Sequence, residues 1–305
     1  MTATGPDAGP SSAGAGPVPP PDAAIDPLIR DAFLAACRAE LQALKPGNVH
    51  VHAPGHRMTV ADFEASAAAA APFVARRGAS VGRRVREGVE ATFAAVGTNT
   101  NLGILLLSAP LAVAAERRAA ALAQGRASPF RAVLGQVLAE LGPGDARDVF
   151  AAIRLANPGG LGAAEEHDVR AEPTAGLMEA MRAAADRDSI AAAYAENFEA
   201  LYRLGLPVIG ALDHGAAILP DTVTEIFLTY LSALPDSHVV RKWGKTVAEE
   251  VRLSAAEYLQ KRGSPGFEHS LLGWDSALKA RGINPGTSAD LTVATIFLHL
   301  IDGDK

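Results

Sequence analysis

The chain has 305 residues, of which 49% are hydrophobic and 20% charged, so it is long enough and apolar enough to fold around a buried core. Its formal net charge of -6 argues against a nucleic-acid partner, because such proteins draw their affinity from clustered positive charge. A single cysteine, Cys37, excludes a disulfide framework within the chain and a metal site built from several thiolates.

The first 25 residues are rich in Pro, Gly, Ala and Ser, and no Lys or Arg precedes Arg30. This composition predicts a disordered N-terminal tail over 1–25. A secretory signal would need a basic start followed by an apolar stretch, and a transit peptide would need arginines. Neither pattern is present, so we expect a cytoplasmic protein.

From Asp26 onward, apolar residues recur at the three- and four-residue spacing of helices, and no segment alternates with the period of a strand. Pro27 directly after Asp26, and Thr59 three residues before Asp62, are typical of helix starts. The periodicity predicts helices over 26–44, 59–74, 80–96, 102–122, 128–141, 145–156, 174–185, 188–204, 221–234, 239–261 and 288–301. We find no flexible linker and no fixed-period repeat, so residues 26–305 are expected to form an all-α, single-domain bundle of about a dozen helices.

The uncharged span from Ala91 to Ala115 is long enough for a membrane helix. Asparagines and threonines lie in its middle and Pro110 interrupts it, so a helix of the protein core is the better interpretation, and no membrane contact is expected.

Polar segments marked by Gly and Pro connect the predicted helices, at 44–58, 97–103, 157–169, 234–245 and 283–291. Helix starts have unpaired backbone N–H groups that receive anions, so these junctions are candidate ligand sites. Each also has a simpler interpretation. His50, His52 and His56 suggest zinc, but Pro54 and Gly55 break the helix that would align such ligands.

The other junctions are equally ambiguous when taken singly. Lys45 is either a solvated loop lysine or a phosphate contact held by a rigid turn. The NPGGLG segment at 157–162 has glycines but not the spacing of a P-loop or a dinucleotide fingerprint, and PGTSAD at 285–290 reads as an ordinary helix start capped by Thr287 or Ser288. The surplus of Asn and Thr at 98–101 exceeds what one helix cap needs.

Taken in order, four of these motifs resemble a known family. KPGNV at 45–49, NTNLG at 99–103, D-S-x-x-x-x-K-x-G at 236–244 and PGTSADL at 285–291 are similar to the motifs of the triphosphoribosyl-dephospho-CoA synthase family. The resemblance covers roughly residues 40–302. It implies an all-helical transferase that joins the triphosphoribosyl part of ATP to 3'-dephospho-CoA with loss of adenine, in prosthetic-group or cofactor biosynthesis, with ATP as substrate and Mg²⁺ as cofactor.

The chain departs from the family motifs at three places. Asn101-Leu102 stands where the family has His-Lys, His238 where it has Asn, and Lys242-Trp243-Gly244 where it has Arg-Gly-Gly. The NTNLG form resembles archaeal and methylotroph members. An alternative is therefore a related enzyme, or a non-catalytic binding protein beside a partner enzyme of the same pathway, in the biosynthesis of a one-carbon carrier such as methanopterin or methanofuran. A ribose glycoside hydrolase using water as the acceptor would share the same site chemistry.

The reaction that the resemblance implies indicates which residues are the expected catalytic and binding residues. Breaking an N-glycosidic bond passes through an oxocarbenium-like state, which needs a carboxylate near the ribose and a base for the incoming hydroxyl. Asp236 and Asp290 are the expected catalytic residues and Mg²⁺ ligands. Nucleotide and phosphate contacts are expected from a larger polar set: Lys45, Asn48, His56, Arg57, Asn99, Thr100, Asn101, Arg241, Lys242 and Ser288. We predict that five of the site residues converge in one pocket: Lys45, Asn99, Asn101, Asp236 and Asp290.

Overall fold

A computed structural model describes residues 16–53, 55, 58–158, 169, 171–212 and 218–302. These ranges contain fourteen α-helices, and backbone pairing between extended residues is limited in them to isolated bridges, so the all-α prediction is confirmed. The helices are α1 (Pro27–Gln42), α2 (Val60–Val74), α3 (Val81–Val96), α4 (Leu102–Leu122), α5 (Phe130–Ala139), α6 (Pro143–Ala156), α7 (Leu177–Ala184), α8 (Ser189–Ala195), α9 (Leu206–Leu212), α10 (Pro220–Ala233), α11 (Ser237–Trp243), α12 (Lys245–Gln260), α13 (Phe267–Ala280) and α14 (Gly286–Asp302).

Side-chain caps stabilise two of the predicted helix starts. Asp26 accepts hydrogen bonds from the N–H groups of Leu28 and Ile29, and Pro27 takes the first helical position, where its missing N–H is harmless. Thr59 and Asp62 form the reciprocal capping box that their spacing predicts. These caps satisfy backbone donors that the helix itself leaves open.

Four helical segments differ from the sequence prediction, and one of them is α9, which no predicted helix covers. The helix predicted over 239–261 is two helices, because Gly244 has a φ of 86° and ends α11 before α12 begins. The helix predicted over 188–204 is interrupted after Ala195 and followed by a π-helical turn, Leu201–Gly205. Helix α13 was not predicted, because only Leu271, Asp275 and Leu278 are buried along it, which is a narrow apolar stripe.

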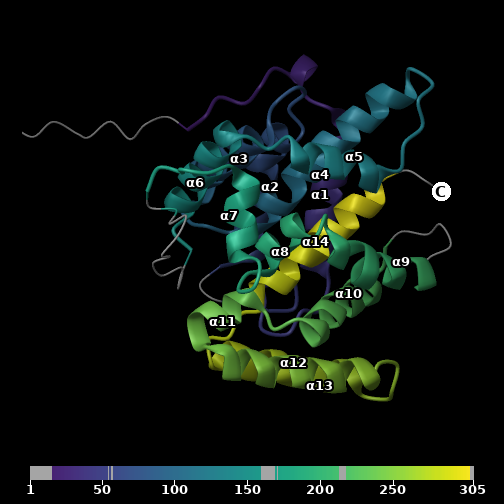
Figure 1. Cartoon of the computed structure of the whole chain (residues 1–305). Helices are drawn as coiled ribbons and strands as arrows, with labels where there is room; N and C mark the ends of the chain where they lie inside the picture. Colours follow the sequence, from purple (N-terminus) through teal and green to yellow (C-terminus); the bar gives the residue numbers. More distant parts are fainter. Residues whose placement is uncertain are drawn as a thin grey trace, which may run out of the picture.

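Helix α14 runs through the middle of the molecule and packs against α1, α4 and α10 (Figure 1). One hydrophobic cluster is built mainly from α1 to α8 together with α14, and it includes Phe33, Leu105 and Phe297. A second, smaller cluster is built from α10, α11, α12 and α13. It also includes Leu44, just after α1, and Ala289 in α14. The first turns of α14 therefore lie where the two clusters meet.

Within the described residues, no helix is long and apolar enough to cross a membrane. The Leu-rich α4 instead contributes its buried side chains to the larger hydrophobic cluster, as the asparagines just before it and Pro110 within it predict.

Candidate active site

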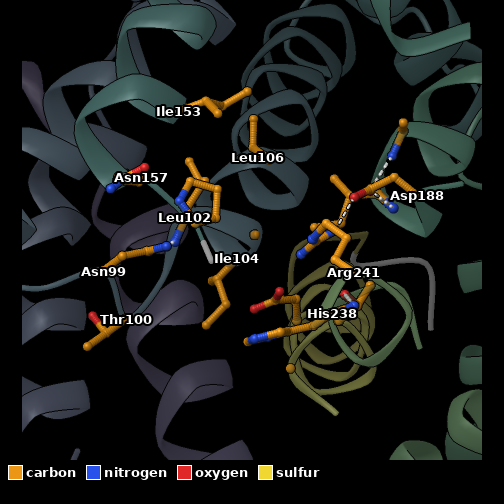
Figure 2. Close-up of a pocket in the computed structure, with 18 of the residues that line it drawn as sticks. Asn99, Thr100, Leu102, Ile104, Leu106, Ile153, Asn157, Asp188, His238 and Arg241 are labelled. Carbon is orange, nitrogen blue, oxygen red and sulfur yellow. Dashed lines mark hydrogen bonds and ion pairs between the residues drawn. The ribbon is translucent and has the colours of Figure 1, made fainter. Parts of the chain in front are cut away.

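A cavity of about 1250 Å³ opens where the ends of several helices meet. Its wall comes from α1, α4, α6, α7, α8, α11 and the start of α14, and Figure 2 shows part of this lining. Pockets of several hundred Å³ are typical of sites for organic substrates, so the cavity has room for a nucleotide and part of an acceptor.

Asp290, in the first turns of α14, is set into the cavity wall. In the described part of the chain its carboxyl group accepts no hydrogen bond and forms no ion pair. Burial raises the pKa of Asp290 well above its ordinary value, and the negative charges of Asp236 and Glu40 raise it further, against the opposing effect of Arg241. A carboxyl group with a raised pKa and no hydrogen-bond partner among the described residues is suited to proton transfer.

Asp236 lies beside this carboxyl but does not line the cavity. Its Oδ1 caps α11 by accepting from the N–H groups of His238 at 3.0 Å and Val239 at 3.1 Å. Its Oδ2 accepts from the backbone N–H of Ser288 at 2.7 Å and from the Ser288 hydroxyl at 2.8 Å. These four bonds use the accepting capacity of a carboxylate, so Asp236 and Ser288 join α11 to α14.

Glu40, on α1, also lines the cavity. Its Oε1 lies 3.0 Å from the ammonium of Lys45, whose side chain is fully buried and also donates to the carbonyl oxygen of Val49. Burial raises the pKa of Glu40 and lowers that of Lys45, while the attraction between the two groups opposes both shifts. Lys45 thus lies behind the cavity wall and holds Glu40 at it.

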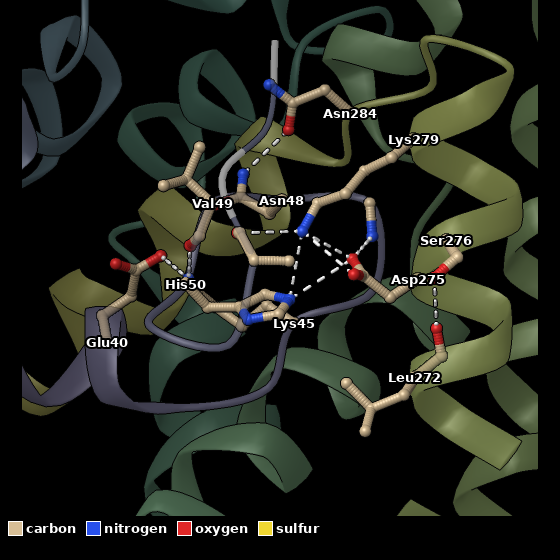
Figure 3. Close-up of polar contacts among 12 residues, drawn as sticks. Glu40, Lys45, Asn48, Val49, His50, Leu272, Asp275, Ser276, Lys279 and Asn284 are labelled. Carbon is tan, nitrogen blue, oxygen red and sulfur yellow. Dashed lines mark hydrogen bonds and ion pairs between the residues drawn. The ribbon is translucent and has the colours of Figure 1, made fainter. Parts of the chain in front are cut away.

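The KPGN turn is anchored by a polar cluster that includes Asp275 and Lys279 of α13 (Figure 3). Gly47 donates its backbone N–H to Asp275 Oδ1 at 2.8 Å. The side-chain amide of Asn48 donates to the side-chain oxygen Oδ1 of Asn284 at 2.8 Å. Asp275 in turn lies 3.0 Å from the ammonium of Lys279 and 3.3 Å from His50. The cluster fixes the position of Asn48 and Asn284, both of which line the cavity.

The polar surplus of the NTNLG segment divides into two groups. Asn101 is buried, and its amide exchanges hydrogen bonds with Thr92, while Thr100 donates to Ser66 at 2.6 Å. Asn99 faces the cavity instead and accepts from the backbone N–H of Leu102 at 3.2 Å, which caps α4. The two asparagines therefore have different surroundings, although only one residue separates them.

Arg241, on α11, lines the cavity and its guanidinium lies 2.5 Å from Asp188, the residue that caps α8. Its Nε is buried without a partner in the described part of the structure. His238 lines the same end of the cavity, close to Gly286, whereas Lys242 is exposed and lies outside the lining. Asp188, His238 and Arg241 therefore lie at one end of the cavity (Figure 2).

The predicted site residues fall into three groups. Asn48, Asn99, Thr100, Arg241 and Asp290 line the cavity. Lys45, Asn101, Asp236 and Ser288 are buried in the surrounding hydrogen-bond network, and Lys242 is on the surface. His56 and Arg57 lie outside the described residues.

Several lining residues were not predicted: Glu40, Asn157, Asp188, His238 and Asn284. The sequence does contain a signal for Glu40, because it shares the buried face of α1 with Phe33 and Cys37 at helical spacing, and a charge on such a face requires a partner. Asn157, His238 and Asn284 lie in polar junctions that the sequence marks as candidate ligand sites, but no local pattern selects them within those junctions, and Asp188 lies outside them.

A large cavity enclosed by helix ends, with a carboxyl group that has no partner among the described residues, is the kind of site that binds a small organic substrate. The model of the family CitG: ATP:dephospho-CoA triphosphoribosyl transferase matches residues 27–305, and the chain belongs to this family of transferases.

A solved structure shows the same fold. It is the crystal structure of a protein from Archaeoglobus fulgidus, proposed to be a triphosphoribosyl-dephospho-CoA synthase, with a TM-score of 0.59 and 24% sequence identity. The similarity covers 79% of this chain and 99% of that one. No curated protein matches the chain.

Proposed function

We propose that this chain transfers the triphosphoribosyl group of ATP to an acceptor hydroxyl in the cavity around Asp290, with release of adenine. In this reaction the bond between ribose C1' and the adenine nitrogen breaks, and the electron pair leaves with the base. A bond forms between C1' and the acceptor oxygen. The acceptor gives up its hydroxyl proton and the departing adenine gains one, so the reaction conserves protons and needs no oxidant or reductant.

The observation that carries the proposal is the carboxyl group of Asp290, which has no partner in the described part of the chain and faces a cavity large enough for a nucleotide. Its raised pKa suits a base that takes the acceptor's proton. In its ionised form it also stabilises the positive charge that develops on the ribose.

Glu40 is proposed as the second carboxylate of the reaction. Its pairing with Lys45 favours the ionised form, whereas Asp290 has no such partner among the described residues. Two carboxyl groups in different surroundings can take different roles, one transferring a proton and the other stabilising charge. Lys45 acts through Glu40, as a positioning residue.

We propose that the described residues hold no Mg²⁺ ion of their own. They contain no group of three or more side chains able to hold a metal ion, and both oxygens of Asp236 are occupied by hydrogen bonds. Asp188 is likewise engaged by Arg241 and by the start of α8. We propose that Mg²⁺ enters with the phosphates of ATP as part of the substrate, and no step depends on it here.

The experiment that tests the function is an incubation of the protein with ATP, Mg²⁺ and dephospho-CoA, with adenine measured by chromatography and the product by mass spectrometry. We expect equal amounts of adenine and of triphosphoribosylated acceptor. Adenine without the joined product indicates a hydrolase. Absence of adenine with every acceptor, together with absence of ATP binding, would refute the proposal.

The departures from the family motifs bear on which acceptor the enzyme uses. His238 and Asn101 stand where the family has other residues, and His238 lines the cavity. Parallel incubations with pterin and furan precursors of one-carbon carriers therefore belong in the same assay. Adenine release with such a precursor and not with dephospho-CoA would keep the reaction and replace the acceptor. A partner enzyme of the same pathway stays a prediction from the sequence.

A further inference from the structure

The cavity has two chemically different ends (Figure 2). Asp188, His238 and Arg241 lie at one end, and Arg187 adjoins them in the chain. Asn99 and Asn157 lie on the other side, with apolar side chains of α4 and α6 around them, among them Leu102, Leu106 and Ile153. The end of the cavity around Asn99 and Asn157 is thus uncharged in the described lining, and it offers apolar surface beside two carboxamide groups.

Asn99 presents a hydrogen-bond donor to this uncharged end. Its Oδ1 accepts the backbone N–H of Leu102, and this bond fixes which end of the amide carries the NH₂ group. No side chain or backbone group of the described residues accepts a hydrogen bond from that NH₂ group. The α4 cap therefore holds a free donor in a defined position on the cavity wall.

Asn157 adds a second amide at the rim. It ends α6 with a φ of 41° and a ψ of 57°, the left-handed conformation that Asn and Gly adopt most readily. Its side chain is exposed and makes no hydrogen bond with the described residues. An amide that offers both a donor and an acceptor is suited to the edge of a purine base, whose ring nitrogens and amino group are complementary to it.

We infer that the Asn99 end of the cavity is the subsite for the leaving adenine. The inference rests on the proposed function and adds a direction for ATP. The flat, uncharged base lies between the apolar side chains of α4 and α6, the ribose lies near Asp290, and the triphosphate extends toward Arg241 and Arg187.

The chemistry of the leaving group supports this direction. As the bond from C1' breaks, the electron pair moves onto the adenine ring, where the Asn99 NH₂ group donates a hydrogen bond to a ring nitrogen. The amide transfers no proton, and the base gains its proton from solvent. The described lining at this end offers the triphosphate no cation, whereas Arg187 and Arg241 line the cavity beside Asp188.

Two substitutions separate this role from the helix-end role of each asparagine. N99D keeps an oxygen that caps α4 and places a negative charge favourably at a helix start, but it replaces the free donor by an acceptor. N157G keeps the left-handed conformation and removes only the amide. N99A and N157A are the matched controls that also disturb the backbone.

The probes are adenine and sodium tripolyphosphate, each titrated into the folded protein and followed by ligand-observed NMR, with melting temperatures recorded for every variant. We expect N99D to weaken adenine binding about tenfold or more and N157G about threefold to tenfold, the effect of one or two neutral hydrogen bonds. Tripolyphosphate binding should stay within about twofold of wild type, because its contacts lie at the other end.

Three outcomes would overturn the inference: unchanged adenine binding in N99D and N157G, weakened tripolyphosphate binding in place of adenine, or an increase in the KM for dephospho-CoA alone. The last would assign this end to the acceptor. If wild-type protein releases adenine from ATP and N99D does so equally well, the inference fails and the proposed function stands. If wild type neither binds nor releases adenine, both fail.

Discussion

Gly103 in α4 lies so close to Asp290 in α14 that a β-carbon at position 103 would be 2.0 Å from Asp290 Oδ2 and 2.5 Å from its Cγ. No side chain fits in that space, so the glycine of the NTNLG motif is what allows the carboxyl group to approach the start of α4. Two motifs that are far apart in the sequence thus depend on each other sterically.

Substitution of Gly103 by Ala is expected to displace the Asp290 carboxyl group and to lower kcat by about 10²-fold, because catalysis depends on its position. Stability should change by only about 1–3 kcal/mol, since the cost of overpacking is partly offset by the better helix propensity of Ala. Gly273→Ala in α13 is the control, because a β-carbon there meets nothing within 4 Å. Equal activity of G103A and G273A would contradict the steric account.

Asp290→Asn is expected to stabilise the protein at neutral pH. The pKa of Asp290 is raised in the folded state, so the folded protein holds this proton more tightly than the unfolded chain does. The stability that the group contributes is complete below the ordinary Asp pKa of about 3.9 and is lost as the pH rises through the raised value.

Urea unfolding of wild type and D290N at several pH values measures this effect. We expect the advantage of D290N to grow from acid toward neutral pH. An advantage that shrinks over the same range would mean that the carboxyl group is stabilised in its ionised form.

Lys45→Met leaves the buried Glu40 carboxylate without its partner and is expected to destabilise the protein by about 3–5 kcal/mol. The double variant E40Q/K45M should recover much of this loss, because no buried charge remains. Chemical unfolding of the two single variants and the double variant gives the coupling energy. If Lys45 contacts substrate phosphate directly, K45M would instead keep its stability and lose affinity for tripolyphosphate.

Asp236→Asn tests whether this residue holds α11 to α14 or binds the metal. The amide nitrogen cannot accept from Ser288 or from the α11 backbone, so we expect a loss of about 1–3 kcal/mol per donor left unsatisfied. The Mg²⁺ concentration that gives half-maximal activity should not change. A large increase in that concentration with unchanged stability would assign Asp236 to the metal.

The sequence was a good guide to the helices and to the motifs, because caps and apolar spacing act within a few residues. Asp26 and Thr59 begin their helices as predicted, and Asp290 lines a cavity with Asn99. The sequence could not show which residues of a motif face the cavity and which are buried behind it. Whether Asn99 or Asn101 faces the cavity depends on Ser66 and Thr92, which belong to other helices.

The same limit applies to the charged residues. A lysine before a Pro-Gly turn looks like a surface phosphate contact, yet Lys45 is fully buried because Glu40 on the inner face of α1 offers it a partner. Asp236 and Asp290 look equivalent in sequence, but only the Asp236 carboxylate accepts hydrogen bonds from Ser288 and from the start of α11. These distinctions depend on contacts between distant segments, which no local pattern contains.

The most direct test of the account is single-turnover release of adenine from ATP by wild type and D290N, with dephospho-CoA and Mg²⁺ present and ATP binding measured on the same preparations. We expect D290N to bind ATP within about threefold of wild type and to release adenine at least about 10³-fold more slowly, since it lacks both the base and the charge near the ribose. Adenine release by D290N at the wild-type rate would contradict the proposed role of Asp290.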